Sequence, residues 1–315
     1  MITAVGLDAL SKPEGSVVTI GTFDGMHLGH RALIARTKDE ARRRGLVSAV
    51  VTWDRHPNAT LRPDAVPLLL STPERKVQLI EELGVDILLV LPFDRELSQW
   101  PPERFVRDAL VNGLAARAVV VGQGWRFGHR AAGDVALLSE LGGDMGFDAE
   151  GLPLVTVAGE PASSSRVRGC ISAGDMVLTR ALLGRPFALE GRVVPGDDRG
   201  ASLGYPTANV TLDPAIAAPP RGIYAGRAWV EDQVYPAAIS LGVKPTFGGD
   251  PDRSPLVLEA FLLDFVGDLY GADLRIEFLE RLRDELKFDS VDELVAQMDR
   301  DVTATRRLHD RPEAV

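Results

Sequence analysis

Two different apolar patterns follow one another along this chain of 315 residues, and they meet near residue 184. Before that point, uninterrupted apolar runs alternate with stretches of helical composition. Apolar runs without alternation indicate strands that are buried on both faces, as in a parallel sheet covered by helices. We therefore predict a doubly wound α/β domain over residues 1–183. Its expected strands lie at 16–20, 48–53, 86–91 and 118–121.

The helices expected between these strands carry ordinary start and stop signals. Pro73 and Pro102 suit the first turn of a helix, and Gly84 follows the end of the first of these two. After Pro102, the residues Phe105, Val106, Ala109 and Leu110 recur on one face. Two further helices are expected at 30–44 and 169–183.

The second half of the chain, residues 184–315, has a different pattern. It is rich in glycine and proline and contains closely spaced strand-like pieces, which are typical of an antiparallel barrel or sandwich. The pieces lie at 191–194, 223–230, 237–241, 256–265 and 274–278. A final helix is predicted after Ser290, a suitable cap, with an apolar stripe formed by Val291, Leu294, Val295, Met298 and Val302.

Composition excludes several classes of protein. The formal net charge of −10 argues against a nucleic-acid or membrane-surface binder. The lone Cys170 excludes a disulfide framework and a cysteine zinc site. No apolar run approaches the ~18 residues needed to span a bilayer, and the N-terminus lacks a secretion signal. We expect a cytoplasmic enzyme that acts on small molecules and is a monomer or a weak homo-oligomer.

The first chemical motif follows the strand at 16–20 directly, at Gly21–His30. In an open α/β sheet the first strand–helix turn is a preferred ligand site. Gly21, Gly25 and Gly29 allow a close backbone approach, while His27 and His30 share one face at the positive end of a helix. This pattern favours an anion such as a triphosphate. A plain glycine turn with surface histidines and a zinc site are the weaker alternatives.

Gly21–His30 resembles the GTFDGxHxGH segment of the N-terminal, nucleotidylyltransferase-like domain of bacterial bifunctional riboflavin kinase/FAD synthetases. Residues 52–57 are similar to its TFxPHP segment, with Arg55 in place of proline, and residues 163–168 to its SSTxIR segment. The resemblance implies that His27, His30 and Arg168 are catalytic. It also implies nucleotide contacts from Gly21, Phe23, Asp24, Gly25, Gly29, Ser164 and Ser165.

A third segment, residues 121–128, resembles a family segment in which asparagine commonly precedes an aromatic residue. Gly124 occupies the asparagine position here, which weakens the prediction of adenylyl transfer. Trp125 and Phe127 are interpreted either as flavin contacts or as core residues. Gly122 and Gly124 also mimic part of a dinucleotide fingerprint, but the third glycine, Gly128, comes one residue late, which argues against an NAD site.

The second chemical motif spans Gly196–Asn209 and is not a P-loop. Gly196, Gly200 and Gly204 are spaced to bend a loop around phosphates, and Thr207 and Asn209 offer oxygen ligands for Mg²⁺. A long glycine-rich turn without function is the alternative reading.

Residues 204–209 are similar to the GxPTAN motif of the riboflavin kinase domain, a β-barrel in that family. Residues 242–247, 262–271 and 282–288 resemble its GxRPTF, LLDFxxDLYG and LRxExKF segments. The resemblance implies that Glu259 is the catalytic base, although an outward-facing glutamate is the simpler reading of a barrel strand. It further implies a flavin contact from Arg283 and a departure at Phe261, where histidine is common.

Taken together, the resemblance implies ATP-dependent phosphorylation of riboflavin to FMN, followed by adenylyl transfer from ATP to FMN, with Mg²⁺ as cofactor. Two alternatives remain. One is a monofunctional riboflavin kinase with a degenerate nucleotide-binding N-terminal domain, motivated by Gly124. The other is a non-catalytic flavin-binding protein.

Overall fold

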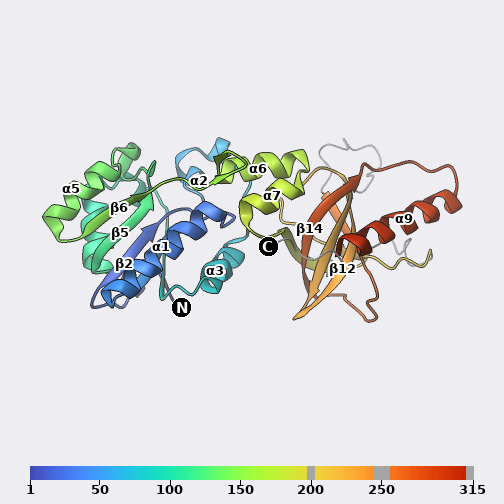
Figure 1. The fold of residues 1–315 in the computed structure, drawn as a ribbon, viewed down its shortest axis with the longest axis horizontal. Coiled ribbons are helices and arrows are strands. Elements are labelled where there is room, and N and C mark those ends of the chain that lie inside the picture. The colour runs from blue at the N-terminus through green and yellow to red at the C-terminus, as the bar shows by residue number, and fades with distance from the viewer. Residues whose placement is uncertain (197–202, 244–255, 310–315) are drawn as a thin grey trace. The chain divides into compact units, whose positions relative to one another are not determined.

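The structure is a computed structural model that describes residues 1–196, 203–243 and 256–309 (Figure 1). The chain divides into two compact units, Met1–Ser164 and Ser165–Val315. The second unit therefore begins earlier than the domain boundary at 183/184 that the sequence suggested, and that boundary stays a prediction.

The first unit contains a parallel sheet, as predicted, and its six strands have the order β1-β4-β3-β2-β5-β6. Its strands are β1 (Ile2–Val5), β2 (Ser16–Ile20), β3 (Val47–Trp53), β4 (Ile87–Leu91), β5 (Ala116–Gly122) and β6 (Asp148–Leu152). The sequence did not predict the two edge strands, β1 and β6.

Helices cover both faces of this sheet. The main ones are α1 (Leu28–Arg44), α3 (Pro73–Glu82), α4 (Pro102–Phe105) with the π-helical η4 (Val106–Gly113), and α5 (Val135–Met145). Val18 and Ile20 pack with α4, η4 and α5, whereas Val17 packs with α1. Successive residues of β2 thus enter opposite cores, which confirms the doubly wound prediction.

The remaining elements of this unit are short. They are η1 (Leu7–Ala9), α2 (Asn58–Leu61), η2 (Pro63–Ala65), η3 (Leu97–Gln99), η5 (His129–Ala131), β7 (Thr156–Val157) and β8 (Glu160–Pro161). The last two form a separate two-stranded sheet.

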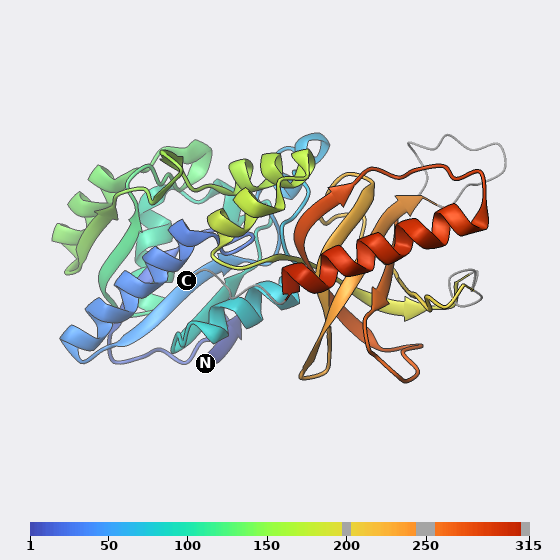
Figure 2. The same ribbon diagram turned by 45° about the vertical axis from the view of Figure 1, so that its right-hand side comes forward.

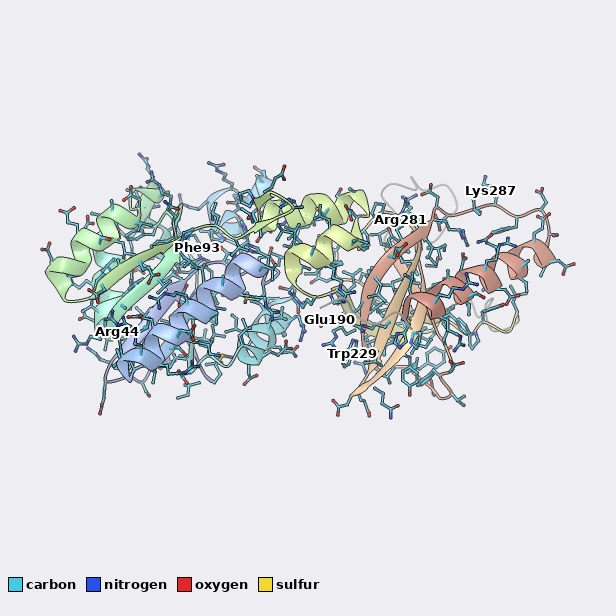
Figure 3. The ribbon with its side chains drawn as sticks, in the orientation of Figure 1. Arg44, Phe93, Glu190, Trp229, Arg281 and Lys287 are labelled. Carbon is cyan, nitrogen blue, oxygen red and sulfur yellow. The ribbon has the colours of Figure 1, made fainter. Side chains whose placement is uncertain are left out.

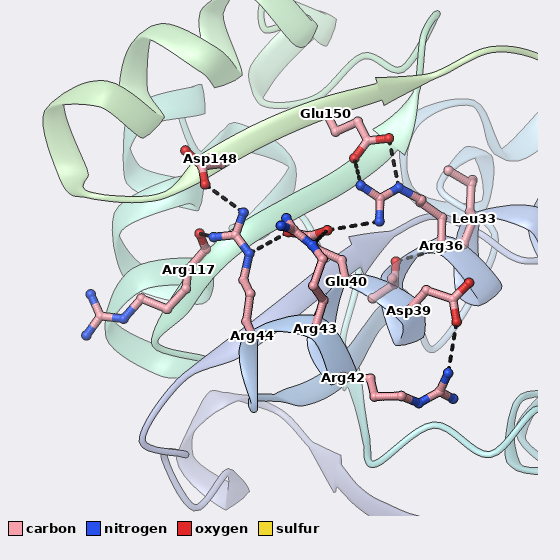
Figure 4. A network of polar contacts seen from close by, with 11 residues as sticks. Leu33, Arg36, Asp39, Glu40, Arg42, Arg43, Arg44, Arg117, Asp148 and Glu150 are labelled. Carbon is pink, nitrogen blue, oxygen red and sulfur yellow. Dashed lines mark hydrogen bonds and ion pairs between the residues drawn. The ribbon is translucent and has the colours of Figure 1, made fainter.

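A charged network fastens α1 to the edge strand β6 (Figure 4). Glu40, whose side chain is 3% exposed, accepts hydrogen bonds from Arg36, Arg43 and Arg44. Arg36 also forms a bidentate pair with Glu150 at 3.0 and 2.7 Å. Bidentate pairs of this kind fix geometry as well as adding energy, so they hold the helix in register with the strand.

The helix predicted at 169–183 is wrong in its bounds. Two helices are found instead, α6 (Ser164–Ala173) and α7 (Met176–Leu183). Gly174, with φ of +75°, interrupts them, and Asp175 then caps α7 by accepting from Leu178 N–H at 2.9 Å. The serine-rich segment is therefore the first turn of a helix and not a loop before one.

The second unit is built on a closed six-stranded barrel with the strand order β10-β13-β12-β11-β14-β9, and all of its strand pairs are antiparallel. The strands are β9 (Phe187–Val194), β10 (Ala208–Val210), β11 (Gly222–Val230), β12 (Gln233–Val243), β13 (Leu256–Leu262) and β14 (Asp273–Arg283). The strand predicted to reach residue 265 stops at Leu262, because Asp264 has φ of +62°.

The C-terminal helix α9 (Val291–His309) lies along the outside of the barrel and contacts β11, β12 and β14 (Figure 2). Ser290 Oγ accepts from Glu293 N–H at 3.2 Å, so the predicted cap is confirmed. No helix within the described part of the chain has the length and apolar character to cross a membrane.

Candidate functional site

The turn after β2 has an unusual backbone. Phe23, Gly25 and Met26 have φ of +50°, +76° and +45°. A Cβ at Gly25 would also lie 2.7 Å from Leu70, so both conformation and space require glycine there. The predicted nucleotide-binding turn is thus a tightly folded segment at the carboxyl end of the sheet.

Asp24 holds this turn together. Its Oδ1 accepts from Leu70 N–H at 2.8 Å, and its main-chain carbonyl accepts from Ser164 Oγ at 3.0 Å. The Asp24 side chain is buried, so its position is fixed by these contacts. One of the predicted nucleotide residues therefore supports the loop.

His27 and His30 lie together at the start of α1, as predicted. Their rings stack with centroids 3.7 Å apart. Burial lowers the pKa of His27 from 6.5 to about 4. Burial, and then repulsion from His27, brings the pKa of His30 well below its usual value. Both imidazoles are accordingly neutral near pH 7.

Hydrogen bonding determines which nitrogen of His27 carries the proton. His27 caps α1, and its Nδ1 accepts from Gly29 N–H at 3.1 Å. The neutral ring must therefore carry its proton on Nε2, which can donate to an oxygen of an anion. His30 Nδ1 is buried and has no hydrogen-bond partner in the described structure.

Ser164, Ser165 and Arg168 lie on the first turns of α6. Spacings of three and four residues place the two serines on the same helix face as Arg168. This arrangement groups two hydroxyls and a guanidinium, which are suitable donors to phosphate oxygens.

The aromatic residues after β5 differ in their surroundings. Trp125 and Phe127 stack on each other with centroids 4.6 Å apart. Phe127 is buried in the core beside Phe105, whereas Trp125 is only partly buried. Gly124 is exposed, and a Cβ there would meet nothing within 4 Å. The flavin contacts stay a prediction, and of the two rings Trp125 is the more accessible.

In the second unit, a cavity of about 280 Å³ lies between the outer barrel face and α9. Glu259 and Phe261 of β13 line it, because they alternate with the buried Leu258 and Ala260. Arg283 of β14 and Thr207 of the β9–β10 segment contribute further polar groups. Glu285 and Leu286 line it from the segment after β14, where Lys287 is marked in Figure 3.

Strand register aligns the two most important polar residues. Asn209 lies directly opposite Glu259 on the β10–β13 ladder, and Ser240 lies opposite Glu259 on β12. Directly opposite residues point to the same face of a sheet. Glu259 thus has an amide on one side and a hydroxyl on the other.

Asn209 has the properties of a cation ligand. Its side chain is 8% exposed, and its buried Oδ1 accepts no hydrogen bond in the described structure. The Asn209 amide packs on Gly196, where a Cβ would lie 2.1 Å from Nδ2. A neutral, buried oxygen without a donor suits a hard divalent cation, so the residues present fit the predicted metal.

Arg283 is held by a buried acid. It forms a bidentate pair with Asp301 of α9 at 2.6–3.1 Å, and Asp301 also accepts from Gln297 Nε2 at 2.9 Å. Tyr205 Oη donates to Asp299 at 2.5 Å, which raises the pKa of Tyr205 to about 12. The α9 helix is therefore linked to both sides of the cavity.

Several cavity residues were not predicted. Tyr205 packs edge-on against Phe261, with centroids 5.2 Å apart, and forms an aromatic wall. Strand alternation could have indicated Ser240, and the aromatic residue within the motif could have indicated Tyr205. No periodic signal marks Asp301 as the partner of Arg283. Gly200 and residues 244–247 of the predicted segment 242–247 lie outside the described residues.

Comparison with known proteins gives two family matches that divide the chain. The FAD synthetase model matches residues 9–166, and the riboflavin kinase model matches residues 183–309.

Two curated relatives match nearly the whole chain. The bifunctional riboflavin kinase/FMN adenylyltransferase of Escherichia coli strain K12 is 36% identical over 96% of each chain. That of Bacillus subtilis strain 168 is also 36% identical, over 91% of this chain and 90% of the relative. A solved structure described as a macrolide-efflux protein from Streptococcus pneumoniae has a TM-score of 0.88 and 30% identity, and covers 97% of this chain and 99% of that one. Both units thus have counterparts within single known chains.

Proposed function

Because the chain belongs to the bifunctional riboflavin kinase/FMN adenylyltransferase family, we propose that it phosphorylates riboflavin to FMN and then adenylylates FMN to FAD. The pairing of Asn209 and Glu259 beside a cavity is the observation that carries the kinase half of this function. The FAD synthetase match over residues 9–166 disfavours a monofunctional kinase.

In the kinase reaction, Glu259 is proposed to accept the proton of the ribityl 5′-hydroxyl as the γ-phosphoryl group of ATP is transferred. Riboflavin would enter the cavity so that this hydroxyl reaches the Glu259 carboxylate. Tyr205 and Phe261 offer apolar surface to the ring system, and Arg283 offers a fixed donor.

ATP and a divalent cation are expected for both reactions, and we propose Mg²⁺ for that cation. Thr207 and Asn209 would hold it through oxygen atoms, in keeping with the unpartnered Asn209 Oδ1. When bound, the cation would neutralise charge on the phosphates. Gly196, Gly200 and Gly204 remain predicted phosphate contacts.

In the adenylyl transfer, a phosphate oxygen of FMN attacks the α-phosphorus of ATP, and pyrophosphate leaves. The protein's proposed contribution is positioning and charge stabilisation. His27 Nε2–H would donate to a phosphate oxygen as a neutral group, with His30 stacked behind it. Ser164, Ser165 and Arg168 are proposed as further phosphate donors, and Gly21, Phe23, Gly25 and Gly29 as the backbone cradle.

Chromatography of the products that two variants form tests whether each domain carries out one of the two reactions. Glu259→Gln is expected to slow FMN formation by about 10²–10⁴-fold while still making FAD from supplied FMN. His27→Gln is expected to do the reverse, with FMN formation kept and FAD formation lost. If either variant lost both activities while remaining folded, the assignment of one reaction to each domain would be wrong.

A further inference from the structure

A half-buried lysine that the proposed mechanism does not use lies close to the first motif. Lys76, on α3, donates from Nζ to the main-chain carbonyl of Trp53 at 2.8 Å and to Thr52 Oγ1 at 3.4 Å. Thr52 Oγ1 in turn donates to Thr22 O at 3.2 Å. The ammonium therefore lies at the carboxyl end of β3, two hydrogen bonds from the turn that carries His27.

The strand register places this ammonium on the ligand side of the sheet. Ile20 of β2 pairs with Val51 of β3, so Thr52 and Trp53 extend just past the end of β2. In open parallel sheets, ligands bind outside the carboxyl ends of the strands.

The charge of Lys76 is poorly compensated within the protein. Both of its acceptors are neutral, and among the described residues it forms no ion pair. Burial lowers the pKa of the Lys76 ammonium, while the more distant Asp24 and Asp54 carboxylates act to raise it. A partly desolvated cation without a direct anionic partner is less favourable than one whose charge a bound anion compensates.

We propose that the Lys76 ammonium binds a phosphate oxygen of a substrate in the N-terminal unit, an inference that rests on the proposed adenylyl transfer. Two acceptors leave one N–H of the ammonium for a ligand. The ligand chemistry is a phosphate oxyanion, supplied either by the 5′-phosphate of FMN or by the polyphosphate of ATP.

Lys38 provides a matched control in the same unit. It lies on α1 and, like Lys76, donates from Nζ to a main-chain carbonyl, that of Leu83. Leu83 follows the far end of α3, away from the carboxyl ends of the strands. If the lysine–carbonyl contact is merely structural, Lys76→Met and Lys38→Met should behave alike.

The experiment uses the full chain with Lys76→Met, Lys76→Arg and Lys38→Met. For each variant, FAD formation is measured with FMN varied at saturating ATP and with ATP varied at saturating FMN. Riboflavin phosphorylation in the same preparations reports on the other domain, and thermal unfolding reports on stability. Binding of inorganic pyrophosphate and of FMN is measured by calorimetry.

We expect Lys76→Met to lower kcat/KM for FAD formation by about 10- to 100-fold, the effect of losing one charged hydrogen bond. Lys76→Arg should recover part of it, and Lys38→Met should match wild type. A raised KM for FMN alone identifies the FMN phosphate. A raised KM for ATP with weaker pyrophosphate binding identifies the polyphosphate.

The inference is overturned if folded Lys76→Met has both KM values and kcat within about twofold of wild type. It is also overturned if Lys76→Met and Lys38→Met lose stability and activity in parallel. Wild-type protein that makes no FAD would instead refute the proposed function. Direct binding of pyrophosphate and of FMN then decides the inference, since one of the two must weaken about tenfold in Lys76→Met and neither should change in Lys38→Met.

Discussion

Replacing Glu40 by glutamine is expected to destabilise the first unit and to change its response to acid. Glu40 is the shared acceptor of Arg36, Arg43 and Arg44 and is almost fully buried. Hydrogen bonds from Arg43 and Arg44 are the main reasons why the pKa of Glu40 falls from 4.5 to about 2. The Gln side chain keeps the shape and one acceptor oxygen but removes the charge that holds three guanidinium groups together.

The magnitude follows from the size of this pKa change. A drop from 4.5 to about 2 corresponds to about 3 kcal/mol at 1.36 kcal/mol per pKa unit. The Arg43 side chain is 69% exposed, so solvent screens part of the attraction. We therefore expect Glu40→Gln to lower the free energy of unfolding by about 1–2 kcal/mol at pH 7.

The stabilising effect of Glu40 should depend on pH in a definite direction. A carboxylate whose pKa is lowered on folding contributes stability that is fully present above its unfolded value of 4.5. That stability is lost as pH falls from 4.5 toward about 2. The difference between wild type and Glu40→Gln should therefore be constant from neutral pH down to about 5 and shrink below it.

The assay must report on the first unit alone. Three of the four tryptophans, Trp53, Trp100 and Trp125, lie in that unit, and the fourth is Trp229. In a Trp229→Phe background, tryptophan fluorescence during urea unfolding follows only the first unit. Titrations at pH 7, 5, 4 and 3 then give the free energy at each pH.

Asp39→Asn is the matched control, because Asp39 pairs with Arg42 on the same helix but both side chains are largely exposed. It should change stability by less than about 0.5 kcal/mol at every pH. Our reasoning about the buried network is refuted if Glu40→Gln resembles Asp39→Asn, or if its effect stays the same down to pH 3.

Three further predictions concern the two sites. Gly124→Asn should change the free energy of unfolding by less than about 0.5 kcal/mol, because a Cβ there meets nothing within 4 Å. The same variant should form FAD faster, and a slower rate would show that the position does not take the family's asparagine. Because burial holds the pKa of His27 near 4, NMR titration should find its ring neutral down to about pH 5. Stability should decline as pH falls from 6.5, the pKa of the ring in the unfolded chain, toward about 4. A ring that titrates near 6.5 in the folded protein would contradict both expectations. Asp301→Asn should raise the KM for riboflavin about tenfold by releasing Arg283, with FAD formation from FMN unaltered. An unchanged KM would show that flavin binding does not depend on the Asp301 contact that holds Arg283.

The sequence predicted those parts of the fold whose signal is local. The run at 16–20 is buried on both faces of the sheet, and Pro73 begins a helix, so composition alone indicated both. The edge strands were missed because little of them is buried: in β6, Asp148 is exposed and Glu150 half-buried. The break at Gly174 was missed because the apolar residues on its two sides continue as if in one helix.

The candidate sites divide in the same way. The spacing of His27 and His30 predicted their shared face, and the ring stack bears this out. The pairing of Asn209 with Glu259 depends on the register between β10 and β13, which the sequence of either strand alone does not specify. Arg283 and Asp301 meet only because α9 returns to the barrel, a long-range packing event.

The strand with the fewest pairing contacts in the barrel, β10, lies at the proposed ligand site. In the described residues, β10 joins β13 through three residue pairs and β9 through two, whereas β11 and β12 share nine. A strand with so few ladder bonds opens more readily than its neighbours. Since that strand carries Asn209, a nucleotide bound there would stabilise the pairing of β10 with its neighbours, and amide exchange at 208–210 should slow more than elsewhere in the domain when substrates bind.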